Sequence, residues 1–218
     1  MIEIIAWVAL SIGLLCALII IADLFGHPQQ MAIMNVVWPL NAWFFGPITL
    51  WAYFKLGRVH KGEQHHTKQQ SPAAQVFVST THCAAGCSFG DAIGGPLVMA
   101  SGLAIAGSVL FTHYIVEFIL AFLFGILFQF AAIYPMHKDK GIGHALKSAL
   151  KADAIALIAF EVGMFAWMAV SHFLLFATLP EPTSPVYWFM MQIAMILGFF
   201  TSYPANWWLM KKGVKHEM

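Results

Sequence analysis

Long apolar stretches, separated by short polar segments, are the feature that most constrains the fold of this chain. Residues 4–22, for example, contain no charged side chain. Because backbone N–H and C=O groups must be satisfied internally in lipid, stretches of about 20 such residues fold as membrane-spanning helices. The composition agrees, since 60% of the residues are hydrophobic, 10% are charged and the mean hydropathy is +0.76. So few charges exclude a soluble enzyme, a disordered chain and a nucleic-acid-binding protein.

The sequence predicts an all-α fold, a single membrane domain over residues 1–218 built from six transmembrane helices. The third span is too long for one crossing and is interrupted by Gly94-Gly95-Pro96, where proline removes a backbone donor. It is either a half-helix or surface helix over 74–93 that leads into a short span, or one tilted helix kinked at the break. The predicted spans are Ile2–Ala22, Met31–Phe54, Ala74–Phe111 (broken), Tyr114–Tyr134, Ala152–Leu179 and Tyr187–Met210.

The placement of the eleven Lys and Arg residues predicts the orientation. Cytoplasmic loops of membrane proteins carry an excess of basic residues. With six crossings and both termini in the cytoplasm, every basic residue falls on the cytoplasmic side. We therefore expect a multi-pass protein of the inner (plasma) membrane with both termini cytoplasmic. The basic residues are Lys55, Arg58, Lys61, Lys68, Lys138, Lys140, Lys147, Lys151, Lys211, Lys212 and Lys215.

Small residues recur along the third predicted span, with Gly86, Gly90 and Gly94 at four-residue spacing. Small side chains let helices approach closely within a membrane. We therefore expect this span to be the most centrally packed element.

The same span concentrates groups that bind soft metals. Cys83, Cys87 and Asp91 recur every four residues and share one helix face, and His82 lies about 100° away around the helix. Thiolate and imidazole together suit Cu(I), Zn(II) or a similar thiophilic metal. The sequence therefore predicts a metal site of His82, Cys83, Cys87 and Asp91, although free cysteines also serve as small buried packing residues. Cys16 stands alone and is interpreted as packing.

The fifth predicted span adds a stripe of carboxylate, thioether and imidazole groups close to one helix face: Asp153, Glu161, Met164, Met168 and His172. We interpret Met164 and Met168 as candidate metal ligands. Ionisable residues inside spans are expensive and tend to face the bundle interior. Glu161, Asp153 and, on the fourth span, Glu117 are therefore candidate proton or charge partners. We expect Glu161 to be either protonated or paired in the folded protein.

Further polar residues and methionines lie near the predicted outer ends of the spans. They are interpreted as an outer vestibule that captures a metal ion, with ordinary interfacial residues as the alternative. The members of this group are Asp23, His27, Met31, Met34, His113 and His172.

Two motifs are distinctive, namely His82-Cys-Ala-Ala-Gly-Cys followed by Gly90-Asp, and Phe189-Met-Met-Gln-Ile-Ala-Met followed by Asn206-Trp-Trp. With them, the chain resembles an uncharacterised family of prokaryotic polytopic membrane proteins, classified as a domain of unknown function. The resemblance covers nearly the whole chain from residue 23 onward. It implies a compact polytopic helical protein and brings no established activity. Further matching stretches are His27-Pro-Gln, Ile33-Met-Asn, Val37-Trp-Pro, Gly46-Pro, Leu50-Trp-Ala-Tyr, Phe128-Gln-Phe, Tyr134-Pro-Met, Lys151-Ala-Asp and Glu161-Val-Gly-Met.

Three functions stay open from the residues alone. The first is the handling of a thiophilic metal ion, with copper favoured over zinc, by binding or transport through the His/Cys/Met site. The second is a membrane redox protein that uses a Cys83/Cys87 thiol pair or haem. The cysteine spacing differs from the usual two-residue motif, and haem is not expected because no span carries a suitable pair of histidines. The third is a structural scaffold whose polar residues only specify helix packing.

We expect binding or transport rather than enzymatic catalysis. The expected partners are the lipid bilayer and a metal ion, nucleic acid is excluded by composition, and a homo-oligomer is left open.

Overall fold

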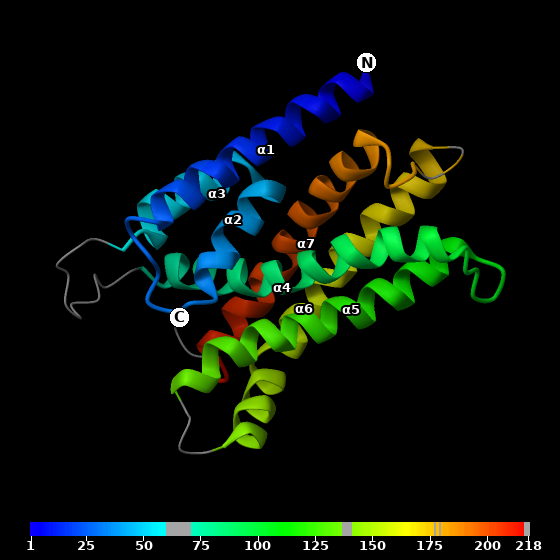
Figure 1. Cartoon of the computed structure of the whole chain (residues 1–218). Helices are drawn as coiled ribbons and strands as arrows, with labels where there is room; N and C mark the ends of the chain where they lie inside the picture. Colours follow the sequence, from blue (N-terminus) through cyan, green and yellow to red (C-terminus); the bar gives the residue numbers. More distant parts are fainter. Residues whose placement is uncertain (60–70, 137–140, 177, 179, 216–218) are drawn as a thin grey trace.

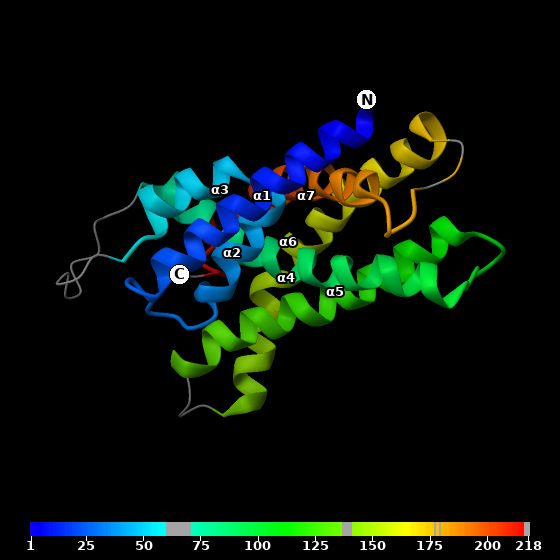
Figure 2. The ribbon, with the colours of Figure 1, turned by 45° about the horizontal axis from the view of Figure 1, so that its top comes forward.

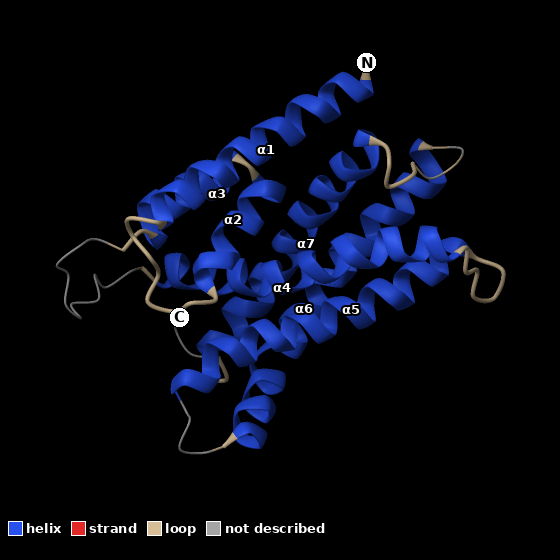
Figure 3. Cartoon of the chain, viewed as in Figure 1, coloured by secondary structure: helices blue, strands red, loops and turns tan. Residues whose placement is uncertain are grey.

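The helices of the chain pack into one bundle (Figure 1), seen in the computed structural model over residues 1–59, 71–136, 141–176, 178 and 180–215. Within these ranges the structure is helical, without a β-strand (Figure 3). The predicted all-α fold is therefore confirmed. In chain order the elements are α1 (Ile2–Leu24), α2 (Met34–Phe45), α3 (Pro47–Ala52), η1 (Tyr53–Gly57), α4 (Pro72–Ser101), α5 (Val109–Ile133), η2 (Tyr134–Met136), α6 (Ile142–Val170), η4 (Ser171–Leu175) and α7 (Pro185–Lys211).

Serine and proline define where three of the long helices begin. The side chains of Ser71, Ser108 and Ser184 accept hydrogen bonds from backbone N–H groups in the first turns of α4, α5 and α7. These bonds satisfy donors that have no partner inside the helix. Pro72 and Pro185 follow at the first helical position, where the missing N–H of proline would have no partner in any case.

The long third apolar region contains one helix, a loop and the start of the next helix. α4 is continuous through Pro96, which agrees with the interpretation of one helix through the break rather than a separate half-helix. The helix ends at Ser101 and is capped by Gly102, whose φ of 63° lies in the left-handed region that favours glycine. α5 then begins at Val109, so the predicted boundary at Phe111 lies inside α5.

Among the described residues, five helices are long and apolar enough to cross a membrane: α1, α4, α5, α6 together with η4, and α7. They support a membrane protein and differ from the predicted six spans at one place. The predicted span Met31–Phe54 is divided into α2, α3 and η1, and each of these elements is too short to cross by itself.

Gly46 reverses the chain between α2 and α3. Its backbone angles, φ 56° and ψ −129°, are ones that residues with a side chain rarely adopt. The next residue, Pro47, has no N–H to donate to the Trp43 carbonyl, which instead accepts a hydrogen bond of 2.7 Å from Gln192 of α7. Residues 34–57 therefore form a helical hairpin, here called the Gly46 hairpin, whose two ends lie on the same side of the bundle (Figures 1 and 2).

Asp23 ties the end of α1 to the end of the Gly46 hairpin. Its carboxylate accepts hydrogen bonds from the Arg58 guanidinium at 2.7 and 3.0 Å and from the Tyr53 hydroxyl at 2.8 Å. The hairpin thus leaves the bundle on the side where it entered. As a result, the N-terminus and the end of α7 lie at opposite ends of the bundle (Figures 1 and 2), which differs from the prediction of both termini on one side.

Basic residues are segregated to one end of this arrangement. The connection between α4 and α5 and the one between η4 and α7 lie at the end where the chain begins (Figure 1), and their sequences contain no Lys or Arg. The described basic residues lie at the close of the Gly46 hairpin, in the first turns of α6 and around the end of α7. Lys61, Lys68, Lys138 and Lys140 lie outside the described residues.

α4 is the most buried of the five candidate spans. In its most apolar stretch of 18 residues, 61% of the residues are buried, against 39% or less in the corresponding stretches of the other four. Its glycines bring it against α5. A methyl group added at Gly86 would lie 2.6 Å from the Gly125 Cα, and one added at Gly90 would overlap the Ala121 backbone. The predicted close helix contact along this stripe is confirmed.

Candidate functional site

Five chemically active side chains meet near the middle of α4. We call Cys83, Cys87 and Asp91 of α4, Glu117 of α5 and Glu161 of α6 the central cluster. Each of them is at most 1% exposed. Such groups are expensive to hold inside a membrane domain and mark candidate ion or proton sites.

Cys83 and Cys87 lie one turn apart on the buried face of α4, and both are free thiols. The two thiols interact electrostatically with each other. The two sulfurs therefore face the same region, in agreement with their four-residue spacing. Cys16 packs in a different hydrophobic cluster, with α2, and takes no part in the central cluster.

The three carboxyl groups of the central cluster face one another across three helices. Asp91 interacts electrostatically with Glu117 and with Glu161, and the Cys87 thiol lies beside the Glu161 carboxyl. Within the described part of the chain, both oxygens of Asp91, both of Glu161 and Oε2 of Glu117 lack a geometrically good hydrogen bond. A buried charge without a partner is strongly unfavourable. The cluster therefore either holds protons or binds a cation.

Glu161 is buried as expected, at 1% exposure. Its close neighbours in the cluster are another acid and a thiol rather than a cationic side chain. The expectation that a proton or a bound cation neutralises it stays a prediction.

His113 extends the central cluster toward the start of α5. Its Nδ1 lies 2.7 Å from Oε1 of Glu117, one helical turn away, and both side chains are buried. His113 also lines a small cavity of about 40 Å³, which has room for about one water-sized occupant.

Four methionines from three helices surround this cavity. We call the cavity the methionine pocket, lined by Met99, Met168, Met190 and Met191 together with His113, Trp167, Ser171, Pro180, Tyr187 and Ala194. The Tyr187 hydroxyl lies against Gly95, near Oε1 of Glu117, because a methyl group added at Gly95 would overlap the hydroxyl and lie 3.2 Å from that oxygen. The pocket therefore joins the central cluster through His113 and Glu117.

Only part of this pocket could be found in the sequence. Met168 and His113 were predicted as site residues, whereas Met99 and Tyr187 were missed because their proximity depends on how α4 and α7 pack. The adjacent Met190 and Met191 were a visible signal. Met164, also predicted, is fully buried and packs in the same hydrophobic cluster as Cys83 and Cys87.

A second polar group lies farther toward the end of α7. We call it the Lys215 cluster, formed by Asp153 of α6, Ser202 and Asn206 of α7, and Lys215. The Lys215 ammonium donates hydrogen bonds to Asp153 Oδ1 at 2.7 Å and to Asn206 Oδ1 at 2.8 Å. Asp153, predicted as a charge partner, thus has a lysine partner that the sequence did not indicate.

His82 lies between the two groups. It is fully buried, it interacts electrostatically with Asp153 and Lys215, and the Gln129 side chain lies beside its ring. His82 therefore faces the Lys215 cluster, while the adjacent Cys83 faces the central cluster. Among the described residues, no three His, Cys, Asp or Glu side chains converge at metal-ligand distances as they stand.

The predicted outer vestibule is divided between the two ends of the bundle. Its first members lie at the end of α1 and around the start of α2, where Asp23 and His27 both contact Arg58. Its other members lie at the opposite end, where α5 begins and α6 continues into η4. The first group is Asp23, His27, Met31 and Met34, and the second is His113 and His172.

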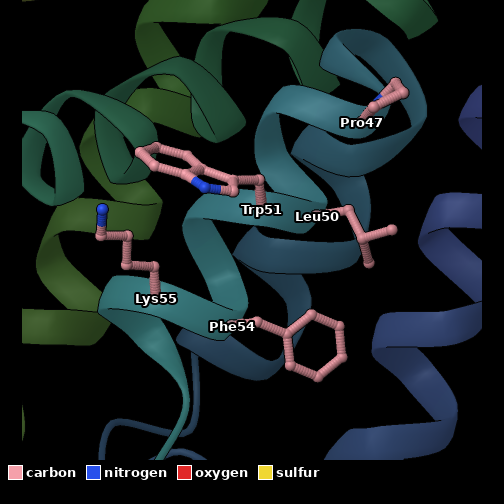
Figure 4. A pocket seen from close by; sticks show the side chains of 5 residues that line it. All are labelled: Pro47, Leu50, Trp51, Phe54 and Lys55. Atoms are coloured by element: carbon pink, nitrogen blue, oxygen red, sulfur yellow. The ribbon is translucent and has the colours of Figure 1, made fainter.

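A hollow on α3 and η1 lies apart from these groups. Figure 4 shows Trp51 and Lys55 pointing to one side of the helix, and Leu50 and Phe54 pointing to the other. The Lys55 ammonium lies 4.8 Å from the centroid of the Trp51 ring. None of the predicted site residues lines this hollow, so it is not part of the candidate site.

Comparison with known proteins gives one match. A family described as a domain of unknown function matches residues 74–215, a range that contains the central cluster, the methionine pocket and the Lys215 cluster. No curated protein and no solved structure matches the chain.

Proposed function

The chain belongs to the DUF4396 family, a domain of unknown function, and we propose that it binds a thiophilic metal cation within the inner (plasma) membrane and transports it, with Cu(I) as the favoured ion. The observation that carries this proposal is the pair of buried thiols beside the carboxyl groups of Asp91 and Glu161, whose oxygens make no geometrically good hydrogen bond with the described residues. Thiolates select soft metals such as Cu(I), and buried carboxyl groups mark ion pathways in membranes.

The acids beside the thiols complete the chemistry of binding. A thiol must lose its proton before it binds a metal, and the Glu161 carboxylate beside Cys87 is placed to accept that proton. Asp91, one turn further along α4, provides a second acceptor. The cluster thus offers both sulfur and oxygen ligands to one ion.

Thioether side chains belong to the same hydrophobic cluster as the thiols. Met164, Met191 and Met195 pack in the same hydrophobic cluster as Cys83 and Cys87. The Ser88 hydroxyl donates a 3.2 Å hydrogen bond to the Met195 sulfur, which fixes the orientation of that side chain. Thioethers are soft ligands that also favour Cu(I).

The methionine pocket is the proposed entrance to the central cluster. A Cu(I) ion held by its thioethers would reach His113, whose Nδ1 is 2.7 Å from Glu117, and then the carboxyl groups and thiols. The steps run along α5 from His113 to Glu117 and then between α5, α4 and α6.

The basic residues support an orientation in which this pocket faces away from the cytoplasm. They lie at the end of the bundle opposite the pocket, where cytoplasmic segments are expected. With five crossings and the Gly46 hairpin re-entering on the cytoplasmic side, the C-terminus is cytoplasmic and the N-terminus is outside. The six-span arrangement differs in placing the N-terminus in the cytoplasm.

Reporter fusions to the full chain test this topology. We expect a fusion after residue 218 to report a cytoplasmic location, and fusions before residue 1 and near Pro182 to report the outside. A cytoplasmic N-terminus would show that residues 31–54 cross the membrane and would restore six spans. A C-terminus outside would overturn the proposed orientation altogether.

Transport is tested with the full chain in proteoliposomes that contain a Cu(I)-sensitive dye. We expect Cu(I) to enter faster than in protein-free vesicles, and excess Ag(I), a softer analogue of the same charge, to compete. Excess Zn(II) should compete weakly. Entry at the rate of protein-free vesicles would overturn transport, and stronger competition by Zn(II) than by Ag(I) would overturn the choice of metal.

A further inference from the structure

The chain turns back after α7 and places Lys215 inside the bundle. Gly213 has a φ of +65°, and the N–H groups of Val214 and Lys215 then donate to the Leu209 carbonyl. Lys211 and Lys212 are exposed at the same helix end, whereas Lys215 is 2% exposed. A short tail thus carries a cationic group into the interior.

The acceptors around the Lys215 ammonium are held in place by α6 and α7. Asn206 donates through Nδ2 to the backbone carbonyl and the hydroxyl of Ser202, both at 3.1 Å, so its carbonyl oxygen is turned toward Lys215. The Ser202 hydroxyl in turn donates to the Ala156 carbonyl at 2.8 Å. Asp153 offers one oxygen to Lys215, and its Oδ2 has no hydrogen-bond partner among the described residues.

His82 connects these acceptors to the proposed metal site. Neither of its ring nitrogens has a geometrically good hydrogen-bond partner within the described part of the chain, and it lies within electrostatic range of Asp153 and Lys215. The next residue along α4 is Cys83. The ammonium therefore lies within electrostatic range of His82, the residue that precedes Cys83 on α4.

We propose that Asp153, Asn206 and His82 form an exit site for the transported cation, and that the Lys215 ammonium occupies this site between transport events. This inference rests on the proposed function and names a second site for the same ion. An arriving cation displaces Lys215, which lies beyond the end of α7 and leaves when the turn at Gly213 opens. When the cation departs, Lys215 returns and prevents a bare carboxylate from remaining buried.

The charge of the occupant indicates the class of substrate. The ammonium carries one positive charge, and Asp153 is the carboxylate that binds it. A site balanced for one charge suits a monovalent ion, and the His82 imidazole favours Cu(I) or Ag(I) among such ions. A divalent ion such as Zn(II) would leave one positive charge uncompensated in the membrane domain.

Lysine labelling of the wild-type chain tests the displacement. Proteoliposomes are treated with an amine-reactive reagent with and without Ag(I) uptake, and modification is read by mass spectrometry. We expect Lys215 to be protected without Ag(I) and to be modified several-fold more during uptake, while Lys212 is modified equally in both conditions. Equal protection of Lys215 in both conditions during measurable uptake would overturn the proposal.

Binding to a variant tests the exit site without relying on transport. Lys215→Met removes the ammonium from Asp153 and Asn206, and we expect this variant to bind one Ag(I) more per chain than the wild type. The control Lys212→Met should bind the same number as the wild type. The additional ion should persist in the Cys83→Ser/Cys87→Ser background, so loss of the thiol site does not remove this readout. If Lys215→Met binds no additional ion, Lys215 only anchors the residues that follow α7. The same conclusion holds if the double variant Lys215→Met/Asp153→Asn folds and retains the additional ion. Should Lys215→Met fail to fold, the labelling of the wild type decides.

Discussion

Replacing Cys83 and Cys87 together with serine is expected to abolish tight Cu(I) binding by the purified full chain. The wild type should bind one Cu(I) at this pair, and the double variant should bind it at least about 100-fold more weakly, because a hydroxyl group is a hard, neutral ligand in place of a soft thiolate. Competition with a Cu(I) chelator of known affinity measures the dissociation constant, and elemental analysis measures the metal content.

The third cysteine provides the matched control. Cys16→Ser alters a buried thiol of the same chemistry in a separate cluster on α1, so it should leave Cu(I) affinity unchanged. Circular dichroism and thermal unfolding in detergent confirm that both variants are folded. If the double variant keeps the wild-type metal content, the cysteines serve packing alone and the scaffold interpretation replaces metal binding.

Glu161→Gln is expected to weaken Cu(I) binding by about 10- to 100-fold. The amide keeps the shape of the side chain but cannot accept the Cys87 proton. A metal binds more weakly when its thiol ligand is harder to deprotonate, and each tenfold loss of affinity corresponds to about 1.4 kcal/mol. The same chelator competition measures the change.

Glu181→Gln is the control for this substitution, since Glu181 is exposed in the connection before α7. The metal-free Glu161→Gln protein should unfold at the wild-type temperature or above it, because neither Glu161 oxygen makes a well-formed hydrogen bond with the described residues. Wild-type affinity in this variant would limit Glu161 to the role of a buried neutral acid.

Helical periodicity was sufficient to predict that Cys83 and Cys87 share a face, because four residues nearly complete a helical turn. The cost of an ionisable group inside a membrane predicted that Glu161 faces the interior. The glycines at 86 and 90 indicated where α4 meets α5. These conclusions depend on local geometry within one helix, which the sequence specifies directly.

Proximity between distant segments could not be predicted in this way. Lys215 was interpreted as one more cytoplasmic lysine, since its contact with Asp153 depends on the left-handed turn at Gly213 and on the packing of α6 against α7. Tyr187 and Met99 come together at the methionine pocket for the same reason.

The number of crossings in the first third of the chain could not be predicted from the positions of the basic residues alone. All eleven basic residues fall on one side both with six crossings and with five crossings plus a hairpin, because no basic residue precedes Lys55 to report the side of the N-terminus. Gly46-Pro47 was visible in the sequence but is also compatible with a kinked span. As a consequence, Asp23 and His27 were assigned to the wrong end of the bundle relative to His113.

The proline at the reversal of the Gly46 hairpin makes the hairpin dependent on a distant helix. The Trp43 carbonyl has no donor within its own helix, since residue 47 is proline, and Gln192 supplies the hydrogen bond. Asn41 of α2 likewise donates to the Thr81 carbonyl of α4 at 2.9 Å. Because an unsatisfied carbonyl in hydrocarbon costs several kcal/mol, the Gly46 hairpin reaches a fully hydrogen-bonded state only when α7 packs against it. The stability of the second apolar segment of the chain therefore depends on the last one.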